Sequence, residues 1–255
     1  MNQCKRLLST LLLLWGFGTT TSGWAGPVTP LYSYNTPPPF HPATADNLST
    51  YLARQFSADE SDHYQFKAQH LPRKRLDILI AKKDWKGAVI WANPEWFSKF
   101  DQGRLLWSEP LATDYNLVLS HKAHPVEYLG PESLKGLRLG GILGHVYAEF
   151  ETMLNQGEMV REDTADYRHN LAKLKEGRVD VTFLPSSALT ALLKINPQLT
   201  HWMHISSKPR NIFQYYMFCD RSNPELMTYL NSRIQQLAHD KYWTREIDSW
   251  HYVAQ

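Results

Sequence analysis

The chain has 255 residues, of which 43% are hydrophobic and 20% are charged, a composition that excludes wholesale disorder and a collagen-like chain. The 27 Lys and Arg exceed the 25 Asp and Glu by two, and Lys5 and Arg6 account for this surplus because the first 25 residues contain no acid. The remainder is formally neutral, so bulk charge favours neither nucleic acid nor an anionic membrane surface as a partner. A chain of this length can bury a good core, as one domain or as two lobes.

The first 25 residues have the pattern of a signal peptide. Two cations precede an apolar stretch that includes Leu11–Phe17, and Gly23 and Ala25 suit the small-residue positions of a signal peptidase site. A membrane anchor is the alternative, but the apolar stretch is shorter than the about 20 residues that a membrane span requires. We therefore expect cleavage after Ala25 and a periplasmic mature protein. Its one remaining cysteine, Cys219, excludes an internal disulfide and is expected to be buried as a small apolar residue.

The apolar periodicity predicts strands that alternate with helices. In chain order the pattern predicts a strand at 31–34, a helix at 47–56, a strand at 64–68, a helix at 74–82, and strands at 88–91 and 116–120. It continues with a turn and strand over 134–142, helices at 144–154 and 167–176, a strand at 179–184, a helix at 187–194, a strand at 215–219, and helices at 224–238 and 241–250. This alternation indicates an α/β protein with mostly parallel sheets.

Several short strings add to this order of elements. They are Pro38–Phe40 after the first strand, Asn93–Trp96, Trp107–Leu111, Leu134–Gly144, Leu174–Asp180 and Asp240–Trp243. In this order they resemble the bacterial periplasmic solute-binding protein family 3, the amino-acid-binding components of ABC transporters. The resemblance extends along almost the whole mature chain.

The resemblance implies a two-lobed periplasmic binding protein fold of type II, with a ligand cleft between lobes that two crossing strands join. It implies that lobe 1 comprises 27–112 plus 220–255 and that lobe 2 comprises 113–219. The crossing strands would be 116–120 and 215–219. Such a cleft agrees with the rule that open α/β sheets bind ligands beyond the carboxyl ends of their strands.

The sequence departs from this family where its members hold an amino acid. An arginine holds the ligand carboxylate in the family, and Trp96 stands at that position here, with Asn93 in place of a threonine. An aspartate holds the ligand ammonium in the family, and Pro185, followed by Ser186, stands there. A site without both groups would leave two ligand charges uncompensated, so the resemblance does not carry over amino-acid specificity.

Aromatic residues remain at the predicted ends of strands in lobe 1. Tyr34, Phe40, Trp91 and Trp96 would give the cleft walls that suit a ring, a sugar face or an alkylammonium group. The alternative is that these rings pack in the core.

Polar candidates come from both lobes. The segment Gly144–Tyr147 is expected to open a helix whose backbone N–H groups favour an anionic or polar group, with His145 as a further donor; a surface cap is the alternative. One cation of Arg73–Arg75 would replace the lost arginine, for which we select Arg75; a solvated basic turn is the alternative. The expected ligand-binding residues are Tyr34, Phe40, Arg75, Trp91, Asn93, Trp96, Gly144, His145, Tyr147 and Ser186.

The sequence contains no catalytic motif that we recognise, and neither pair of histidines, 121/124 or 201/204, has the nearby Cys or acid that a metal site favours. We expect no cofactor, no metal and a monomer. The predicted function is a periplasmic solute-binding protein that clamps a small polar or aromatic or cationic molecule for an ABC transporter. The alternatives are a stand-alone ligand sensor for a signalling receptor, and an enzyme like the cyclohexadienyl dehydratases, which the missing arginine disfavours.

Overall fold

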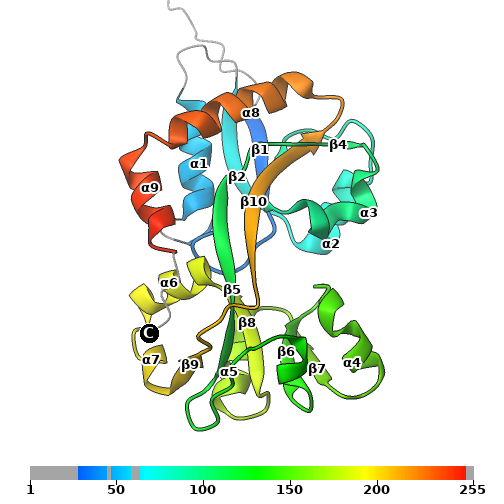
Figure 1. Cartoon of the computed structure of the whole chain (residues 1–255). Coiled ribbons are helices and arrows are strands. Elements are labelled where there is room, and N and C mark those ends of the chain that lie inside the picture. Colours follow the sequence, from blue (N-terminus) through cyan, green and yellow to red (C-terminus); the bar gives the residue numbers. More distant parts are fainter. Residues whose placement is uncertain (1–27, 45–46, 59–63, 251–255) are drawn as a thin grey trace, which may run out of the picture.

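Two long strands, β5 (Ala112–His121) and β10 (Asn211–Asp220), connect the two lobes of the protein (Figure 1). The computed structural model describes residues 28–44, 47–58 and 64–250, so the predicted signal peptide lies outside the described residues. In β10, residues 211–215 pair antiparallel with β5, whereas the other half of the strand pairs with strands of lobe 1. Within the described residues, no helix is long and apolar enough to cross a membrane.

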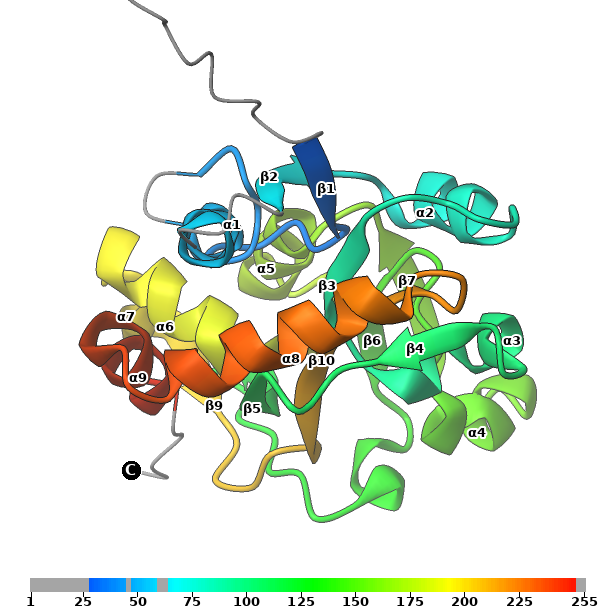
Figure 2. The same ribbon diagram turned by 90° about the horizontal axis from the view of Figure 1, so that it is seen from above.

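Lobe 1 is built on a sheet in the order β2-β1-β3-β10, with β4 also paired to β10. Its strands besides β10 are β1 (Val28–Ser33), β2 (Gln65–His70), β3 (Ala88–Ala92) and β4 (Leu105–Trp107). Its helices are α1 (Leu48–Ser57), α2 (Arg73–Ile80), η1 (Pro94–Phe97), α3 (Ser98–Asp101), α8 (Pro224–Leu237) and α9 (Lys241–Asp248). Seen from above, α1 and α2 lie on the two sides of β1 and β2 (Figure 2).

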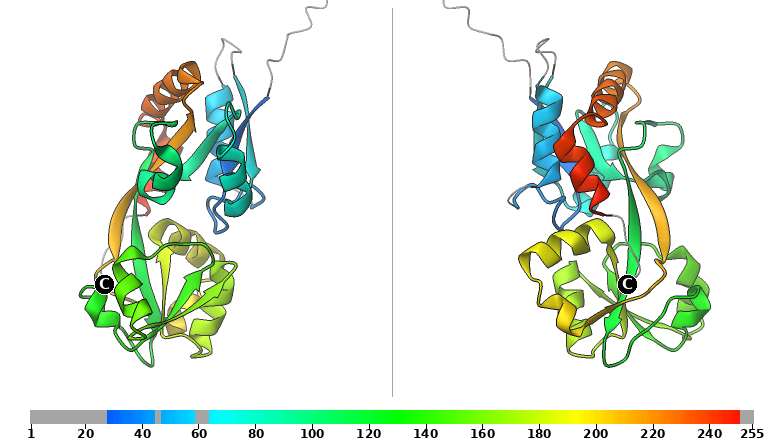
Figure 3. Two further views of the ribbon diagram at one scale, coloured as in Figure 1. Left: turned by 90° about the vertical axis from the view of Figure 1, so that its right-hand side faces the viewer. Right: turned by 60° about the vertical axis from the view of Figure 1, so that its left-hand side comes forward.

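Lobe 2 continues the sheet in the order β5-β8-β6-β7, with β9 paired to β5. Its further strands are β6 (Arg138–Ile142), β7 (Val160–Thr164), β8 (Val181–Pro185) and β9 (Met203–Ile205). Its helices are η2 (Pro131–Leu134), η3 (Ala148–Phe150), α4 (Glu151–Asn155), α5 (Tyr167–Lys175), α6 (Ser186–Ile195) and α7 (Leu199–Trp202). The side views show this lobe as a separate body below lobe 1 (Figure 3).

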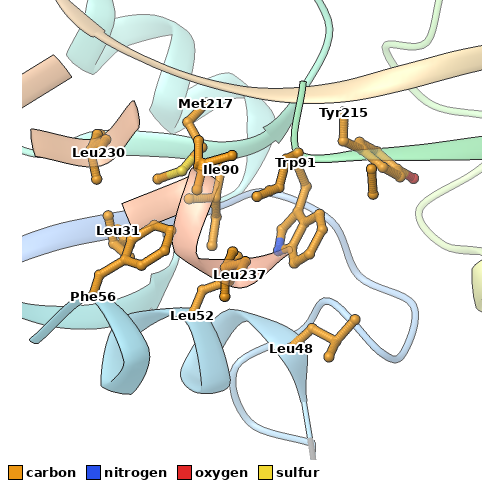
Figure 4. Close-up of a cluster of buried hydrophobic side chains, with 14 of the residues drawn as sticks. Leu31, Leu48, Leu52, Phe56, Ile90, Trp91, Tyr215, Met217, Leu230 and Leu237 are labelled. Atoms are coloured by element: carbon orange, nitrogen blue, oxygen red, sulfur yellow. The ribbon is translucent and has the colours of Figure 1, made fainter. Parts of the chain in front are cut away.

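Each lobe buries apolar side chains on both faces of its sheet, which yields four core clusters. All five residues of β3 are buried, as its continuous apolar run predicts. In the largest cluster, Leu52 of α1 and Leu230 of α8 pack with Ile90 of β3 (Figure 4). Asn47 caps α1, because its side chain accepts a hydrogen bond from the Thr50 N–H at 2.7 Å.

Helix α6 of lobe 2 contacts the C-terminal part of lobe 1, which gives the lobes a connection besides the crossing strands. The Ser186 hydroxyl donates to the Trp250 carbonyl at 2.8 Å, and Lys194 forms an ion pair with Glu246 at 3.2 Å. The two lobes are therefore held together by the crossing strands and also by α6.

The structure corrects the prediction of mostly parallel sheets. Four strand pairs are parallel, but β10 is antiparallel to β3, β4 and β5, and β5 is antiparallel to β8 and β9. The crossing strands cause this mixture, since every antiparallel pair involves β5, which starts the sheet of lobe 2, or β10, which returns the chain to the sheet of lobe 1. The expected helix over 144–154 was also wrong at its start, because a turn with Gly144 at φ +85° precedes η3 and α4. The strands β4, β7 and β9 were not predicted.

Candidate functional site

Charged groups of the two lobes also act on each other at two places other than α6. Arg73, which begins α2 in lobe 1, acts electrostatically on His145 in the turn after β6 of lobe 2. His41 in lobe 1 similarly experiences the charge of Arg168 in lobe 2. Both lobe-2 residues follow the carboxyl end of a strand, where open α/β sheets bind ligands.

Arg73 is the cation of lobe 1 that the fold fixes in this region. Its Nε donates to Asp77 at 2.8 Å, and its Nη2 donates to the Trp96 carbonyl at 2.6 Å. Its guanidinium carbon lies 4.0 Å from the Phe97 ring centroid and 5.5 Å from that of Tyr34. These contacts hold the guanidinium over the Phe97 ring and near that of Tyr34.

Two arginines of lobe 2 flank the ring of Tyr147. The guanidinium carbon of Arg161 in β7 lies 4.7 Å from the ring centroid, and that of Arg210, just before β10, lies 5.1 Å from it. Tyr147 is buried, and its hydroxyl accepts a hydrogen bond from the Ile142 N–H at 3.1 Å. We call Arg73, His145, Tyr147, Arg161 and Arg210 the interlobe arginine cluster.

His145 is the member of this cluster on which the charges of both lobes converge. Its side chain is open to solvent, yet protein surrounds it between the lobes, and this desolvation is the largest cause that lowers its pKa. Arg73, Arg161 and Arg210 lower the pKa further, and Asp163 opposes them. His145 is therefore neutral at pH 7, and its imidazole can both donate and accept a hydrogen bond there.

Two of the four predicted aromatic residues lie in the core of lobe 1. Phe40 and Trp91 are both fully buried, with ring centroids 4.8 Å apart, in a cluster with Tyr215 and Trp250. The Trp91 indole N–H donates to the Ser49 hydroxyl at 2.8 Å. This is the core packing that the sequence left as the alternative, so we leave both residues out of the proposed ligand surface.

Tyr34 and Trp96 lie beside Arg73. Tyr34 is buried, and its hydroxyl donates to the Trp91 carbonyl at 3.3 Å, so only its ring contributes to the edge of the lobe. Trp96 is half-buried, with its ring centroid 5.2 Å from that of Phe213. Asn93 is buried as the cap of η1, and its side chain donates to the Gln214 carbonyl at 3.0 Å.

The remaining predicted residues are placed differently from one another. Gly144 is exposed in the turn after β6, next to His145. Ser186 is buried, and its hydroxyl donates a hydrogen bond to the Trp250 carbonyl. Arg75 is exposed on α2, whereas Arg73 packs against Phe97. The signal for Arg73 was present in the helical spacing, because residues 73, 76 and 80 lie on one face and the last two are the buried leucine and isoleucine of α2.

The described residues contain no group of three or more His, Cys, Asp and Glu side chains that is arranged to hold a metal ion. His204 is instead paired with Glu127 at 2.8 Å. Two shallow hollows lie on the outside of the lobes, one between α5 and α7 and one between α1 and the end of α8. Neither hollow includes a residue of the interlobe arginine cluster, and neither brings charged groups of the two lobes together.

Comparison with known proteins identifies the fold. No family model matches the sequence, and no curated protein matches it. Among solved structures, the GluR0 ligand-binding core in complex with L-glutamate matches with a TM-score of 0.70 and 13% identity, over 89% of this chain and 99% of that chain. The holo arginine-binding protein ArgBP from T. maritima matches with a TM-score of 0.64 and 17% identity, over 88% and 95%.

A third match is AbpA of Streptococcus pneumoniae, an amino acid ABC transporter substrate-binding protein bound to L-arginine. Its TM-score is 0.64 at 15% identity, over 88% of this chain and 94% of that chain. At these identities the likeness concerns the fold. The predicted architecture is confirmed: the chain has the fold of two-lobed type II periplasmic binding proteins, with the lobes joined by two crossing strands.

Proposed function

We propose that this protein is a periplasmic solute-binding protein that clamps a small molecule between its lobes and delivers it to an ABC transporter. The lobes would be 27–112 with 220–255, and 113–219. Residues 1–25 would be removed as a signal peptide, and the mature protein would act as a monomer without a cofactor and without catalysis. The match to an ABC transporter substrate-binding protein of the same fold supports this assignment.

One observation of this chain carries the proposal. Arg73 of lobe 1 and Arg161 and Arg210 of lobe 2 act on the same imidazole, that of His145. A small molecule that enters beside His145 would therefore meet polar groups of both lobes at once. Contacts with both lobes would favour the conformation in which they are close together, which is how a ligand shifts a two-state equilibrium.

The proposed ligand surface is smaller than the set that the sequence suggested. It comprises the ring edges of Tyr34 and Trp96 with Arg73 in lobe 1, and Gly144, His145 and Tyr147 with the two arginines in lobe 2. Asn93 and Ser186 would act indirectly, because their side chains already hold η1 to β10 and α6 to lobe 1.

A thermal-shift screen of the purified protein tests the proposal. The panel contains amino acids, polyamines, sugars, aromatic acids and dicarboxylates. A solute at 100 times its dissociation constant adds about 2.7 kcal/mol to the free energy of unfolding, which is a clear rise in melting temperature. A saturable shift with one chemical class supports a solute-binding protein, and the absence of any shift across the panel contradicts it.

A sensor role would use the same clamp with a signalling receptor as partner. Genes adjacent to the coding sequence separate the two roles. Permease and ATPase genes support transport, whereas a sensor kinase or cyclase gene supports signalling.

A further inference from the structure

Arg210 has the least exposed side chain of the three arginines in the interlobe arginine cluster. Its side chain is only 10% exposed, and its Nε donates to Glu149. Its guanidinium carbon lies 4.8 Å from the Phe183 ring centroid, 5.1 Å from that of Tyr147 and 5.6 Å from that of Phe150. The aromatic rings and one carboxylate therefore fix the plane of the guanidinium before any ligand arrives, which lowers the entropy lost on binding.

The outer edge of this guanidinium remains available. Arg210 donates through Nε, and among the described residues neither of its Nη atoms has a hydrogen-bond partner. Neither Nη atom belongs to the fully buried polar atoms that lack a partner, so both are reachable from solvent. A guanidinium that pairs through Nε can still present Nη hydrogens to an anion.

Arg161 also contacts the Tyr147 ring, and it is held by several hydrogen bonds. It pairs with Asp163 through Nε at 2.6 Å and through Nη2 at 3.0 Å. The same Nη2 donates to the carbonyls of Ile142 at 3.1 Å and His145 at 2.9 Å. Arg161 thus fixes the turn that carries His145 next to Arg210.

Three acids of this region are already paired with the arginines of the cluster. Asp77 pairs with Arg73, Asp163 with Arg161 and Glu149 with Arg210. The carboxylate nearest the end of β8, Asp114, is fully buried and accepts hydrogen bonds from Ser187. An ammonium or guanidinium on a ligand would therefore have to compete with an arginine for each of these three carboxylates.

Lobe 1 offers a second, separate guanidinium edge. Arg73 uses Nε for Asp77 and Nη2 for the Trp96 carbonyl, and among the residues that the structure describes its Nη1 has no hydrogen-bond partner. Because Arg73 and Arg210 are each immobilised within their own lobe, neither is free to swing across to a single anionic group. Each is placed to bind its own.

We propose that the solute is a small dianion, with one anionic group bound by Arg73 of lobe 1 and the other by Arg210 of lobe 2. The anionic groups are two carboxylates, or one carboxylate and one phosphate. This inference rests on the proposed function, since it names the ligand class of the same interlobe site. Of the small polar or aromatic or cationic molecules that the sequence favoured, it keeps the polar class and leaves out the aromatic and cationic ones.

Isothermal titration calorimetry with matched probes tests the inference. The probes are glutarate and 3-phosphoglycerate, which each carry two anionic groups and are called dianions in this sense, 4-aminobutyrate as a zwitterion of similar length, and L-arginine and spermidine as cations. We expect the better of the two dianions to bind at least 100-fold more tightly than 4-aminobutyrate, and both cations to bind more weakly still. The comparison of glutarate with 3-phosphoglycerate identifies which anionic group the protein prefers.

Variants of the full chain locate the second anionic group. Arg210→Gln should weaken binding of the preferred dianion at least 30-fold, and Arg210→Lys, which keeps the charge but loses the planar fork, should weaken it about 10-fold. Arg178→Gln, an exposed arginine of lobe 2 that is paired with Glu176, should leave the affinity unchanged. If Arg210→Gln does not fold, Arg210→Lys carries the test.

The outcomes separate the two proposals. Tight binding of a cation or a sugar, with no heat from either dianion, overturns the dianion but leaves a solute-binding protein. Equal dianion affinity in the wild-type protein and Arg210→Lys overturns the role of Arg210. The absence of binding by every probe here, and by every solute of the thermal-shift panel, overturns both proposals.

Discussion

Asp114 accepts two hydrogen bonds from Ser187, one from its backbone N–H at 3.1 Å and one from its hydroxyl at 2.5 Å. Asp114 lies on the crossing strand β5 and is fully buried, while Ser187 lies in the first turn of α6. The Tyr215 hydroxyl on the other crossing strand is a further partner of this carboxyl group. One buried carboxyl group therefore joins both crossing strands, β5 and β10, to α6, the helix that contacts lobe 1.

This carboxyl group should make stability depend on pH in an unusual direction. Burial is the largest effect on Asp114 and raises its pKa from 3.8 to about 6, against the opposing effect of its hydrogen bonds. Because the pKa in the folded state exceeds that in the unfolded state, the contribution of Asp114 is greatest below about pH 4 and is lost as the pH rises to about 6. The loss is at most about 3 kcal/mol.

Urea unfolding of Asp114→Asn at pH 4, 5, 6 and 7 measures this contribution. The free energy of unfolding of the wild type minus that of the variant should fall as the pH rises from 4 to 7. Glu151→Gln, at an exposed acid of α4, should keep the wild-type profile. Parallel pH profiles for wild type and Asp114→Asn would contradict the prediction.

Trp96→Ala should weaken binding of the solute at least 10-fold. The half-buried indole packs on Phe213, and its removal opens the aromatic surface of lobe 1 while the Trp96 backbone carbonyl that holds Arg73 remains. Calorimetry with the solute that stabilises the protein gives the affinity. Trp202→Ala is the matched control, since Trp202 is also half-buried but stacks on His121 in lobe 2. Equal affinities of the two variants would remove Trp96 from the ligand surface.

Gly87→Ala should reduce the free energy of unfolding by about 3 kcal/mol or more. Gly87 has φ +94°, and a Cβ there would lie 2.3 Å from the Pro30 carbonyl oxygen. Gly136→Ala should cost only about 1 kcal/mol, because Gly136 has a similar φ of +81° but no atom lies within 4 Å of the place that its Cβ would take. Urea unfolding of both variants isolates the clash with Pro30, and equal losses would show that there is none.

The order of elements and the two-lobed fold could be predicted because apolar periodicity and local strings survive in the sequence. The helices at 167–176 and 224–238, for example, match α5 and α8 to within one residue. The short strand β7 escaped prediction because its sequence, Val160–Thr164, is mostly charged and pairs at the edge of the sheet. An edge strand can carry charged residues on its exposed side, so a search for runs of apolar residues does not predict it.

The site was less predictable because it depends on contacts between the lobes. The sequence pointed to His145 and Tyr147 through the glycine-containing segment after the predicted strand at 134–142. Arg161 lies in β7, a strand that the sequence did not predict. Arg210 precedes a crossing strand that begins four residues earlier than its apolar run suggested. Nothing in the spacing of Arg161 and Arg210 indicates that both guanidinium groups contact one tyrosine ring.

The affinity of Arg73→Gln compared with that of Arg75→Gln tests the central claim most directly. Both variants remove one positive charge from the first turn of α2, but only Arg73 packs on Phe97 and acts on His145 of the other lobe. We predict that Arg73→Gln weakens binding of the stabilising solute at least 10-fold, whereas Arg75→Gln changes it less than twofold. Equal affinities of the two variants, or a larger loss in Arg75→Gln, would contradict a ligand held between the lobes at Arg73.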